Sequence, residues 1–359
     1  MSRFARNRRV FFFEEAVFED VEPHIRQQIC ASTGVHVIKP VLQTGTDRSQ
    51  VNAILRQLLN DTLQRNNISS YLTWYYTPMA MEFTGTLDPS AVVYDCMDEL
   101  SAFAGAPRSM LVNEEALFRT ADLVFTGGAS LYESKRKQHG SVHLFPSSVD
   151  KAHFATARAG LADPVDQESI PNPRIGYAGV IDERMDLELV RGIAAARPDW
   201  HFVFLGPIAK ISPDALPQAP NLHWLGMKAY AELPAYFGGW QIGFLPFALN
   251  DATRFISPTK TPEYLSAGLH VISTPIRDVV TPYGQLGLVS IAENSDEFVK
   301  AAEKIFAQPA EGSWAKDTKE FLDRMSWDRT WSAMDQLIEG VLSSKTLDRP
   351  QGRSVLVSD

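Results

Sequence analysis

The chain has only two cysteines, Cys30 and Cys96, among its 359 residues. Two thiols are too few for a disulfide framework or for a thiolate metal site, and both devices are therefore excluded. No run of about 18 apolar residues occurs, so we expect no membrane-spanning helix. The basic start of the chain is not followed by an apolar region long enough for a signal peptide, and a cytoplasmic protein is expected.

The sequence has no excess of positive charge. Thirty-four Lys and Arg residues stand against 43 Asp and Glu residues, and the formal net charge is −9. Nucleic-acid binding needs a basic footprint, so it is not expected here. With 21% charged and 45% hydrophobic residues, the composition is typical of an ordinary globular protein, and the length suffices for two domains.

One local exception lies at the start, where four arginines (Arg3, Arg6, Arg8 and Arg9) surround Phe4. Such a cluster is compatible with peripheral contact to an anionic membrane on the cytoplasmic face. It is equally compatible with a solvated helix face, which is the commoner situation and which we favour.

Motifs for metal and hydrolase chemistry are also missing. The eight histidines show no metal-ligand spacing, and no Asp-x-Asp pair occurs that would hold a divalent ion on a sugar diphosphate. Ser147 and Ser148 lack the flanking glycines of a nucleophile elbow. We therefore expect no metal and no cofactor, and no serine hydrolase.

What the sequence does contain is an alternation of short apolar runs with helical patterns, which predicts βαβ units and parallel sheets in an α/β fold. Strands are expected at 10–13, 35–41, 71–75, 92–95, 123–126 and 142–145, with helices at 48–65, 110–120 and 130–139. After a proline-containing acidic stretch the pattern restarts, with strands at 175–178, 202–205, 222–225, 242–246, 271–273 and 288–291 and helices at 187–196, 230–237, 259–267, 295–307, 314–324 and 327–342. Two doubly wound domains of this kind would enclose an interdomain cleft, the usual place for a ligand.

The most informative segment is 257–273, which predicts a loop, a helix start, a glycine stop and a buried strand. Pro262 is tolerated in the first helical turn, where N–H groups lack intrahelical partners. Lys260 and Glu263 lie three residues apart and project from one face of that turn. A helix N-terminus with a lysine attracts phosphate, and the carboxylate can accept hydrogen bonds from sugar hydroxyls. The segment therefore suggests a nucleotide-sugar site.

Three other positions are candidates for the same cleft. Gly179 follows a strand and permits close approach at the turn, and Arg184 offers a fork of donors to phosphate. Arg254 is a second candidate phosphate clamp, although a surface ion pair explains it equally well. Asp98 follows the strand at 92–95 and can orient an acceptor hydroxyl or act as a base.

Several of these stretches resemble GT-B glycosyltransferases of the large retaining class (family 4-like, glycosyl transferases group 1), in a bacterial branch. The resemblance covers nearly the whole chain. The segments that carry it are 257–273, Asp95-Cys96-Met97-Asp98-Glu99-Leu100-Ser101, Phe125-Thr126-Gly127-Gly128, 143–150, Ile175-Gly176-Tyr177-Ala178-Gly179 and Ser326-Trp327-Asp328.

The resemblance implies a GT-B fold of two doubly wound Rossmann-like domains with an interdomain cleft and a C-terminal crossover helix. The expected divisions are an acceptor-side domain at 1–154, a linker at 155–172, a nucleotide-sugar domain at 173–326, a returning helix at 327–345 and a flexible tail at 346–359. Relatives usually carry a further strand and loop before a segment like 1–9. The first domain is therefore expected to lack its first strand, with an exposed sheet edge and an incomplete acceptor site.

The resemblance also assigns roles. Glu263 matches the glutamate that holds the ribose, Lys260 and Arg184 match cations near the diphosphate, and Gly179 matches the glycine of the first turn. The expected catalytic residues are Asp98, Arg184 and Lys260, and the expected donor-binding residues are Gly179, Arg254, Ser257, Thr259, Lys260 and Glu263. One departure is clear: the family often carries a glutamate eight residues before Glu263, and here that position is Phe255.

The implied function is transfer of a sugar from a nucleotide diphosphate sugar to a glycan or lipid-linked acceptor, with retention and without a metal. Two alternatives remain open. A nucleotide-sugar epimerase would convert the donor with no acceptor present, whereas a non-catalytic or truncated binding subunit would turn over nothing.

Overall fold

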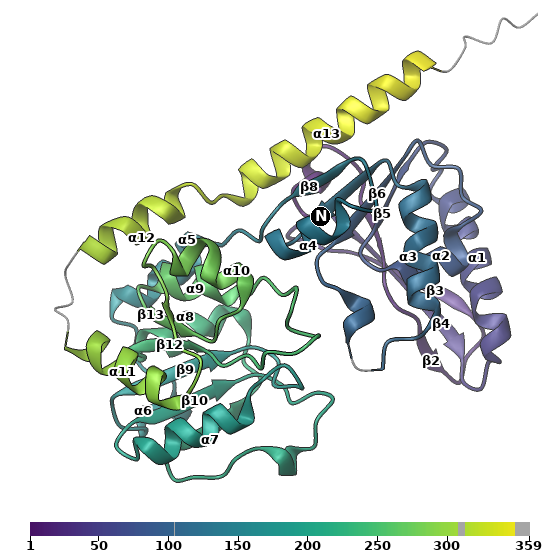
Figure 1. Cartoon of the computed structure of the whole chain (residues 1–359). Coiled ribbons are helices and arrows are strands. Elements are labelled where there is room, and N and C mark those ends of the chain that lie inside the picture. The colour runs from purple at the N-terminus through teal and green to yellow at the C-terminus, as the bar shows by residue number, and fades with distance from the viewer. Residues whose placement is uncertain (104, 308–312, 349–359) are drawn as a thin grey trace, which may run out of the picture.

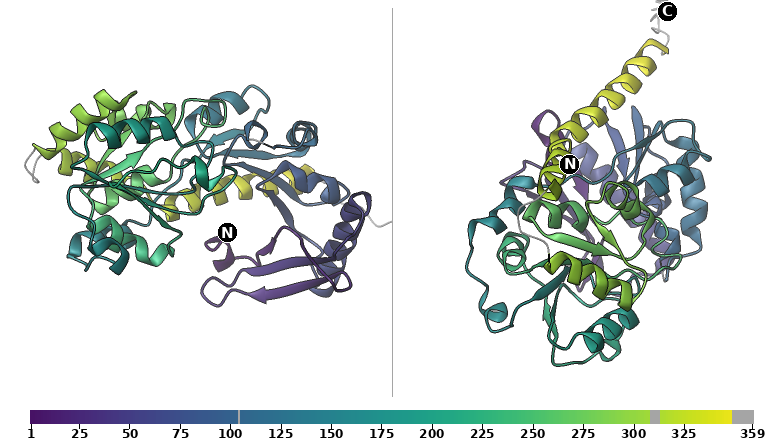
Figure 2. Two further views of the ribbon diagram at one scale, coloured as in Figure 1. Left: turned by 90° about the horizontal axis from the view of Figure 1, so that it is seen from below. Right: turned by 60° about the vertical axis from the view of Figure 1, so that its left-hand side comes forward.

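The computed structural model describes residues 1–103, 105–307 and 313–348. It contains an N-terminal half with strands β1–β8 and a C-terminal half with strands β9–β14, side by side in Figures 1 and 2. Most of the predicted tail at 346–359 lies outside the described residues. No helix among the described residues is both long enough and apolar enough to cross a membrane.

The N-terminal half is built around a parallel sheet of four strands in the order β5-β6-β7-β8. Its central strands β6 and β7 are almost fully buried, as expected for a sheet that is covered on both faces. On one face lie α3 (Ser109–Thr120) and α4 (Ala129–Lys135). The strands are β5 (Leu72–Tyr75), β6 (Ala91–Cys96), β7 (Leu123–Thr126) and β8 (Val142–Leu144).

A second sheet, which the sequence pattern did not separate from the first, precedes it. Here β4 (His36–Gln43) pairs in parallel with β1 (Phe11–Phe13) and β2 (Val17–Glu19), and antiparallel with β3 (His24–Ile29). Helix α1 (Arg48–Arg65) follows, and the short helix α2 (Met81–Thr84) packs against it. The predicted strand at 10–13 thus joins β4, and β5 forms an edge of the main sheet.

The C-terminal half is one parallel sheet of six strands, as predicted, in the order β11-β10-β9-β12-β13-β14. The central strands β9, β12 and β13 are almost fully buried, as expected for a sheet covered on both faces. The strands are β9 (Arg174–Ala178), β10 (His201–Leu205), β11 (Leu222–Gly226), β12 (Ile242–Leu245), β13 (His270–Ser273) and β14 (Ser290–Ile291). The helices are α7 (Leu187–Ala196), α8 (Leu233–Gly238), α9 (Lys260–Ala267), the single turn α10 (Arg277–Val279) and α11 (Ser295–Phe306).

The acidic stretch between the halves is ordered and packs on the C-terminal half. It forms the short helices α5 (Lys151–Ala155) and α6 (Val165–Glu168). The buried indole of Trp240 donates to Gln167 Oε1 at 2.8 Å.

The chain returns to the N-terminal half through α12 (Ser313–Asp323) and the long helix α13 (Trp327–Asp348), which runs along the top of Figure 1. Ile338 of α13 is fully buried against Phe4 and Phe125, on the sheet face opposite α3 and α4. The predicted crossover helix is therefore confirmed.

The arginine cluster at the start of the chain lies against this helix. Arg3 pairs with Asp328 at 2.8 Å, and Arg8 pairs with Asp335 at 2.8 Å and also with Glu339. The positive charge of the arginine cluster is thus partly neutralised by acidic residues of α13. Neither sequence interpretation anticipated this arrangement. Exposed pairs of this kind stabilise a fold by only about 0–1 kcal/mol each.

Candidate active site

The first turn of α9 carries the two residues that the sequence placed on one face. Pro262 lies in this turn without a broken hydrogen bond, and Gly268 ends the helix with φ +84°, a value that glycine adopts readily. Lys260 Nζ lies 2.6 Å from Glu263 Oε2. The Glu263 side chain is only 12% exposed. Burial raises the pKa of Glu263, and the charge of Lys260 partly offsets this effect.

An aromatic pair that sequence reasoning missed lies near Glu263. The His153 ring stacks on Tyr230 with centroids 4.4 Å apart and planes 12° apart. Burial and the charge of Glu263 raise the pKa of Tyr230 to about 12. His153 had been passed over because it lacks metal-ligand spacing, and no local signal links it to Tyr230, 77 residues away. The pair forms an aromatic platform beside the carboxylate.

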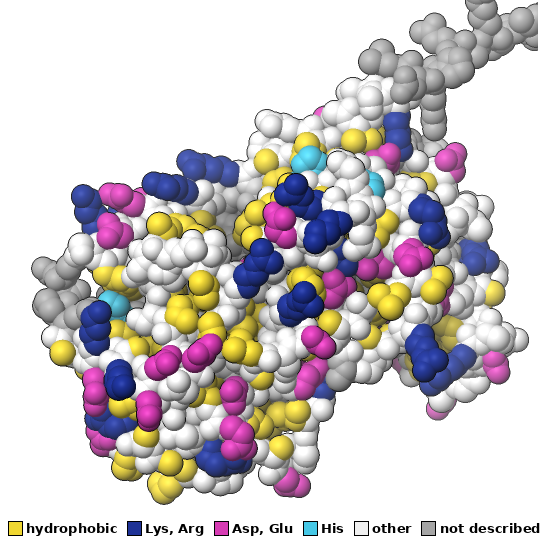
Figure 3. Space-filling model, viewed as in Figure 1, with side chains coloured by type: hydrophobic (Ala, Val, Ile, Leu, Met, Phe, Trp, Pro, Cys, Tyr) yellow, Lys and Arg dark blue, Asp and Glu magenta, His cyan; other side chains and the backbone are white. Residues whose placement is uncertain are grey.

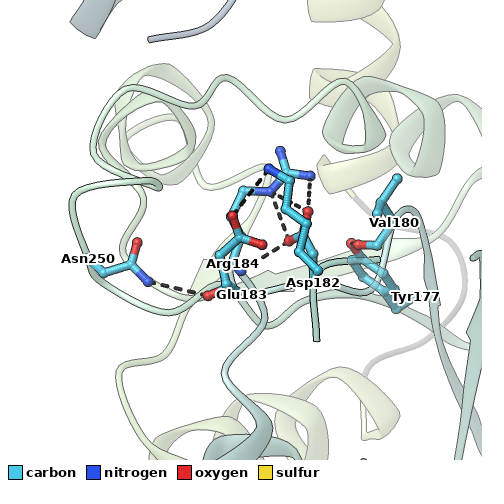
Figure 4. A network of polar contacts seen from close by, with 7 residues as sticks. Tyr177, Val180, Asp182, Glu183, Arg184 and Asn250 are labelled. Atoms are coloured by element: carbon cyan, nitrogen blue, oxygen red, sulfur yellow. Dashed lines mark hydrogen bonds and ion pairs between the residues drawn. The ribbon is translucent and has the colours of Figure 1, made fainter. Parts of the chain in front are cut away.

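Arg184 lies on the loop after β9, where Asp182 holds it in a fork-like ion pair (Figure 4). Its Nη2 is 2.7 Å from Asp182 Oδ2, and its Nε is 3.0 Å from Oδ1. Asp182 is buried, and its hydrogen bonds raise the pKa of Arg184. The guanidinium is therefore fixed in direction but shares its charge with a carboxylate.

Residues of the N-terminal half meet Arg184 across the cleft. The ring of Phe103 lies 5.5 Å from the Arg184 guanidinium carbon and 4.8 Å from Lys210 Nζ. Asp98 is half-buried, and burial raises its pKa while Arg184 lowers it. Arg184 is thus close enough to influence the charge of Asp98, although the two residues come from different halves of the chain.

A buried ion cluster anchors the loop that carries Asp98 and Phe103. Lys135 of α4 is 2% exposed and pairs with Glu99 at 2.9 Å and with Glu114 at 2.8 Å. The hydroxyl of Tyr94 donates to the same Glu114 carboxylate at 2.7 Å. Glu99 follows Asp98 directly, so this cluster fixes the start of the cleft-facing loop.

The remaining predicted donor-site residues have mixed surroundings. A Cβ on Gly179 would lie 2.7 Å from the Tyr177 hydroxyl, so this turn is tight against the protein itself. Thr259 is exposed and makes no side-chain cap at the start of α9. Arg254 is exposed, lies over the Phe255 ring and lines a cavity that Lys260 and Glu263 do not line.

Ser257 and Phe255 both lie at the contact between the two halves. Phe255 packs on the apolar core of the N-terminal half, which accounts for an apolar residue where the family often has glutamate. A Cβ on Gly128 would lie 2.8 Å from Ser257 Cβ and 2.1 Å from an Asp278 oxygen. The buried Asp278 carboxylate accepts the backbone N–H of Ser130 at 3.0 Å, across the interface. This acidic cap on α4 was not anticipated from the sequence.

Asp95 lies at the end of β6 and is buried. Trp74 Nε1 donates to Asp95 Oδ2 at 3.1 Å, and burial raises the pKa of Asp95 to about 7. The folded state therefore holds a proton on Asp95 at pH values where the unfolded chain has released it. Stability should fall as the pH rises from about 4 to about 7, by up to about 1.4 kcal/mol per pH unit from this group.

We therefore expect Asp95→Asn to flatten the dependence of unfolding free energy on pH between 5 and 7. The measurement is urea denaturation at half-unit steps of pH. Asp317→Asn, on the exposed face of α12, is the control and should leave the slope unchanged. A slope in Asp95→Asn equal to that of the parent protein would contradict this titration.

In the described part of the chain, no group of three or more His, Cys, Asp or Glu side chains is arranged to hold a metal ion. The candidate site presents cations, carboxylates and the N-terminus of α9.

Comparisons with known proteins give three kinds of result. No protein-family profile matches the sequence. The candidate teichuronic acid biosynthesis glycosyltransferase TuaH of Bacillus subtilis (strain 168) is 24% identical over 277 residues, which cover 71% of this chain and 68% of TuaH.

Solved structures are similar over almost the whole chain. Sucrose-phosphate synthase from Thermosynechococcus elongatus superposes with a TM-score of 0.72 at 15% identity, covering 96% of this chain and 91% of that one. An E. coli trehalose-6-phosphate structure bound with UDP-2-fluoro glucose has a TM-score of 0.66 at 11% identity and covers 92% of each chain. Anabaena Alr3699/HepE in complex with UDP and glucose has a TM-score of 0.62 at 14% identity and covers 86% of each chain.

Proposed function

We propose that this chain, a glycosyltransferase with the GT-B fold, transfers a sugar from a nucleotide diphosphate sugar to a glycan or lipid-linked acceptor, with retention and without a metal. The observation that carries the donor assignment is the Lys260–Glu263 pair on the first turn of α9. It lies beyond the carboxyl end of β12, at the edge where open α/β sheets bind ligands.

In the proposed complex Lys260 and Glu263 no longer contact each other, and each binds a different part of the donor. Lys260 turns to the diphosphate, beside the first N–H groups of α9, and balances the charge that develops as the sugar–oxygen bond breaks. Glu263, freed from Lys260, accepts hydrogen bonds from the ribose hydroxyls. Burial supports this role, because a carboxylate in a poorly solvated site binds hydroxyl donors more strongly than in water.

Two further residues complete the proposal, Arg184 from the same half as Lys260 and Asp98 from the N-terminal half across the cleft. Arg184 keeps its direction through Asp182 and contributes a second cation near the diphosphate. Asp98 orients the acceptor hydroxyl, since its raised pKa brings it closer to the range useful for proton transfer. Gly179, Ser257 and Thr259 surround the donor through their backbones, and the proposal gives them no proton transfer.

The names and bound ligands of the similar proteins guide the choice of ligands to test. Two of the similar structures were solved with UDP or a UDP-sugar analogue, so UDP is the first donor product to test. The name of TuaH refers to teichuronic acid, a polymer, which supports a growing glycan as the acceptor class.

Calorimetric titration with UDP tests the donor site. Glu263→Gln should bind UDP at least tenfold more weakly than the parent protein, because a hydrogen bond to a charged group contributes about 1.5–3 kcal/mol. The matched control is Glu188→Gln, which removes an exposed carboxylate from α7 in the same half. Equal UDP affinity in Glu263→Gln and the parent would overturn the assignment of Glu263 to the ribose.

The same preparation separates the alternatives. Conversion of a UDP-sugar with no acceptor present would indicate an epimerase, and absence of both binding and turnover would indicate a non-catalytic subunit. Transfer that is abolished by EDTA and restored by a divalent ion would refute the metal-independent part of the proposal.

A further inference from the structure

A cavity of about 530 Å³ lies between the two halves, beside the Asp278–Ser130 contact. One wall is α4 of the N-terminal half, and the other consists of the segments that follow β12 and β13. Lys137, Arg254 and Arg277 line it together with Ser130, Ser134 and Asn250. Figure 3 shows Lys and Arg side chains gathered along this border, over α4 and the loop after β12.

The positive charge of this cavity is largely uncompensated. Within the described residues, Lys137, Arg254 and Arg277 are in no ion pair with a carboxylate. Arg277 lies near Asp278, where burial raises the pKa of the carboxyl and the charge of Arg277 partly offsets this rise. Of the two acidic residues in the lining, Glu133 is engaged by Arg136 at 3.3 Å, and only Asp251 remains. Three free cations at one place in a chain of net charge −9 favour an anion there.

The cavity is separate from the proposed donor site but attached to it. Neither Lys260, Glu263 nor Arg184 lines it. Asn250, which does line it, donates to the carbonyl of Glu183 at 3.4 Å, on the loop that carries Arg184 (Figure 4). An anion bound in this cavity would therefore lie between the two halves, next to the proposed reacting centre.

We propose that this cavity binds the phosphoryl or diphosphoryl group of the acceptor. The proposal rests on the proposed function, and it names the acceptor as an anionic phosphate ester. The volume is within the range of small-molecule sites. The two arginines present planar donor forks that suit phosphate oxygens, and the serine hydroxyls of α4 add donors from the opposite wall.

The test is calorimetric titration of the full chain with inorganic pyrophosphate in the presence of saturating UDP, at low ionic strength. The parent should retain a pyrophosphate site, and the double variant Arg254→Gln/Arg277→Gln should bind pyrophosphate at least tenfold more weakly. The control is Arg191→Gln/Lys316→Gln, which removes two exposed cations elsewhere in the C-terminal half. Equal pyrophosphate affinity in the double variant and the parent would overturn the proposal.

Further titrations identify the source of the phosphate group and separate a failure of this proposal from a failure of the proposed function. Competition by geranyl diphosphate but not by glucose 1-phosphate indicates a lipid-linked acceptor, and the reverse indicates a soluble sugar phosphate; either supports the site. Binding of phosphatidylglycerol vesicles that the double variant loses and that pyrophosphate does not displace would instead indicate that these arginines contact a membrane surface, and it would overturn the proposal. Should UDP not bind, the proposed function fails, while titration of Lys260→Met with pyrophosphate alone still reports on the cavity.

Discussion

Replacement of Lys260 by methionine should lower turnover about a hundredfold to a thousandfold, because one lost donor to a developing charge costs about 2.7–4 kcal/mol. The side chain keeps its length, and it is partly exposed, so the fold should tolerate the change. The measurement is turnover of a UDP-sugar under saturating donor, with thermal unfolding as the check on folding.

The same variant has a second consequence. Burial raises the pKa of Glu263, and without Lys260 only the weaker influence of His153 offsets it, so the pKa of this carboxyl rises further. Nucleotide affinity in Lys260→Met should therefore weaken as the pH falls and Glu263 takes up a proton. Lys319→Met, on the surface of α12, provides the control for the loss of a lysine charge. Turnover within twofold of the parent would remove Lys260 from the mechanism.

Replacement of Lys135 by methionine should destabilise the protein by about 3–5 kcal/mol, because it leaves two buried carboxylates without their counter-ion. Burial alone would lower the pKa of Lys135, but the negative groups around it, Glu99 and Glu114 among them, raise it overall. The lysine is therefore charged in the folded state, and its removal is felt at neutral pH. Urea denaturation should show a clearly lower midpoint.

Two further variants test whether the loss of stability comes from the buried ion cluster. Lys137→Met, at an exposed position two residues beyond the end of α4, should change stability by less than about 0.5 kcal/mol. In Lys135→Met/Glu114→Gln one of the stranded charges is gone while Tyr94 keeps an acceptor, so part of the stability should return. A loss below about 1 kcal/mol in Lys135→Met would show that the two carboxylates find other partners.

Much of the fold was predictable because local signals define it. Helices α1 and α7 have the predicted bounds, and α9 begins one residue later than expected. Proline and glycine mark such boundaries through backbone geometry alone. Strands β2 and β3 were missed, since β2 is short and β3 is polar and mostly exposed. Their pairing with β4 depends on tertiary contacts, which the hydrophobic period and the strand propensity of the sequence do not reveal.

The candidate site divides in the same way. Lys260 and Glu263 were predicted as neighbours because helical spacing dictates it, and they are in contact. Asp278 and Phe103 were not foreseen as members of the cleft. Asp278 reaches Ser130 over 148 positions of sequence, and only the approach of the two halves gives either residue its role. The prediction of a glycosyltransferase with the GT-B fold is confirmed, whereas the roles of the individual site residues stay predictions.

The returning helix α13 also constrains how this protein can fold during synthesis. The apolar face formed by Val93, Leu123 and Phe125 is covered by Ile338 and its neighbours. These emerge roughly 200 residues later, a delay of about 10–40 s at ordinary rates of translation. During this interval the N-terminal half can form its core on the α3 and α4 face, but the opposite face of the sheet stays exposed to water until α13 has been synthesised.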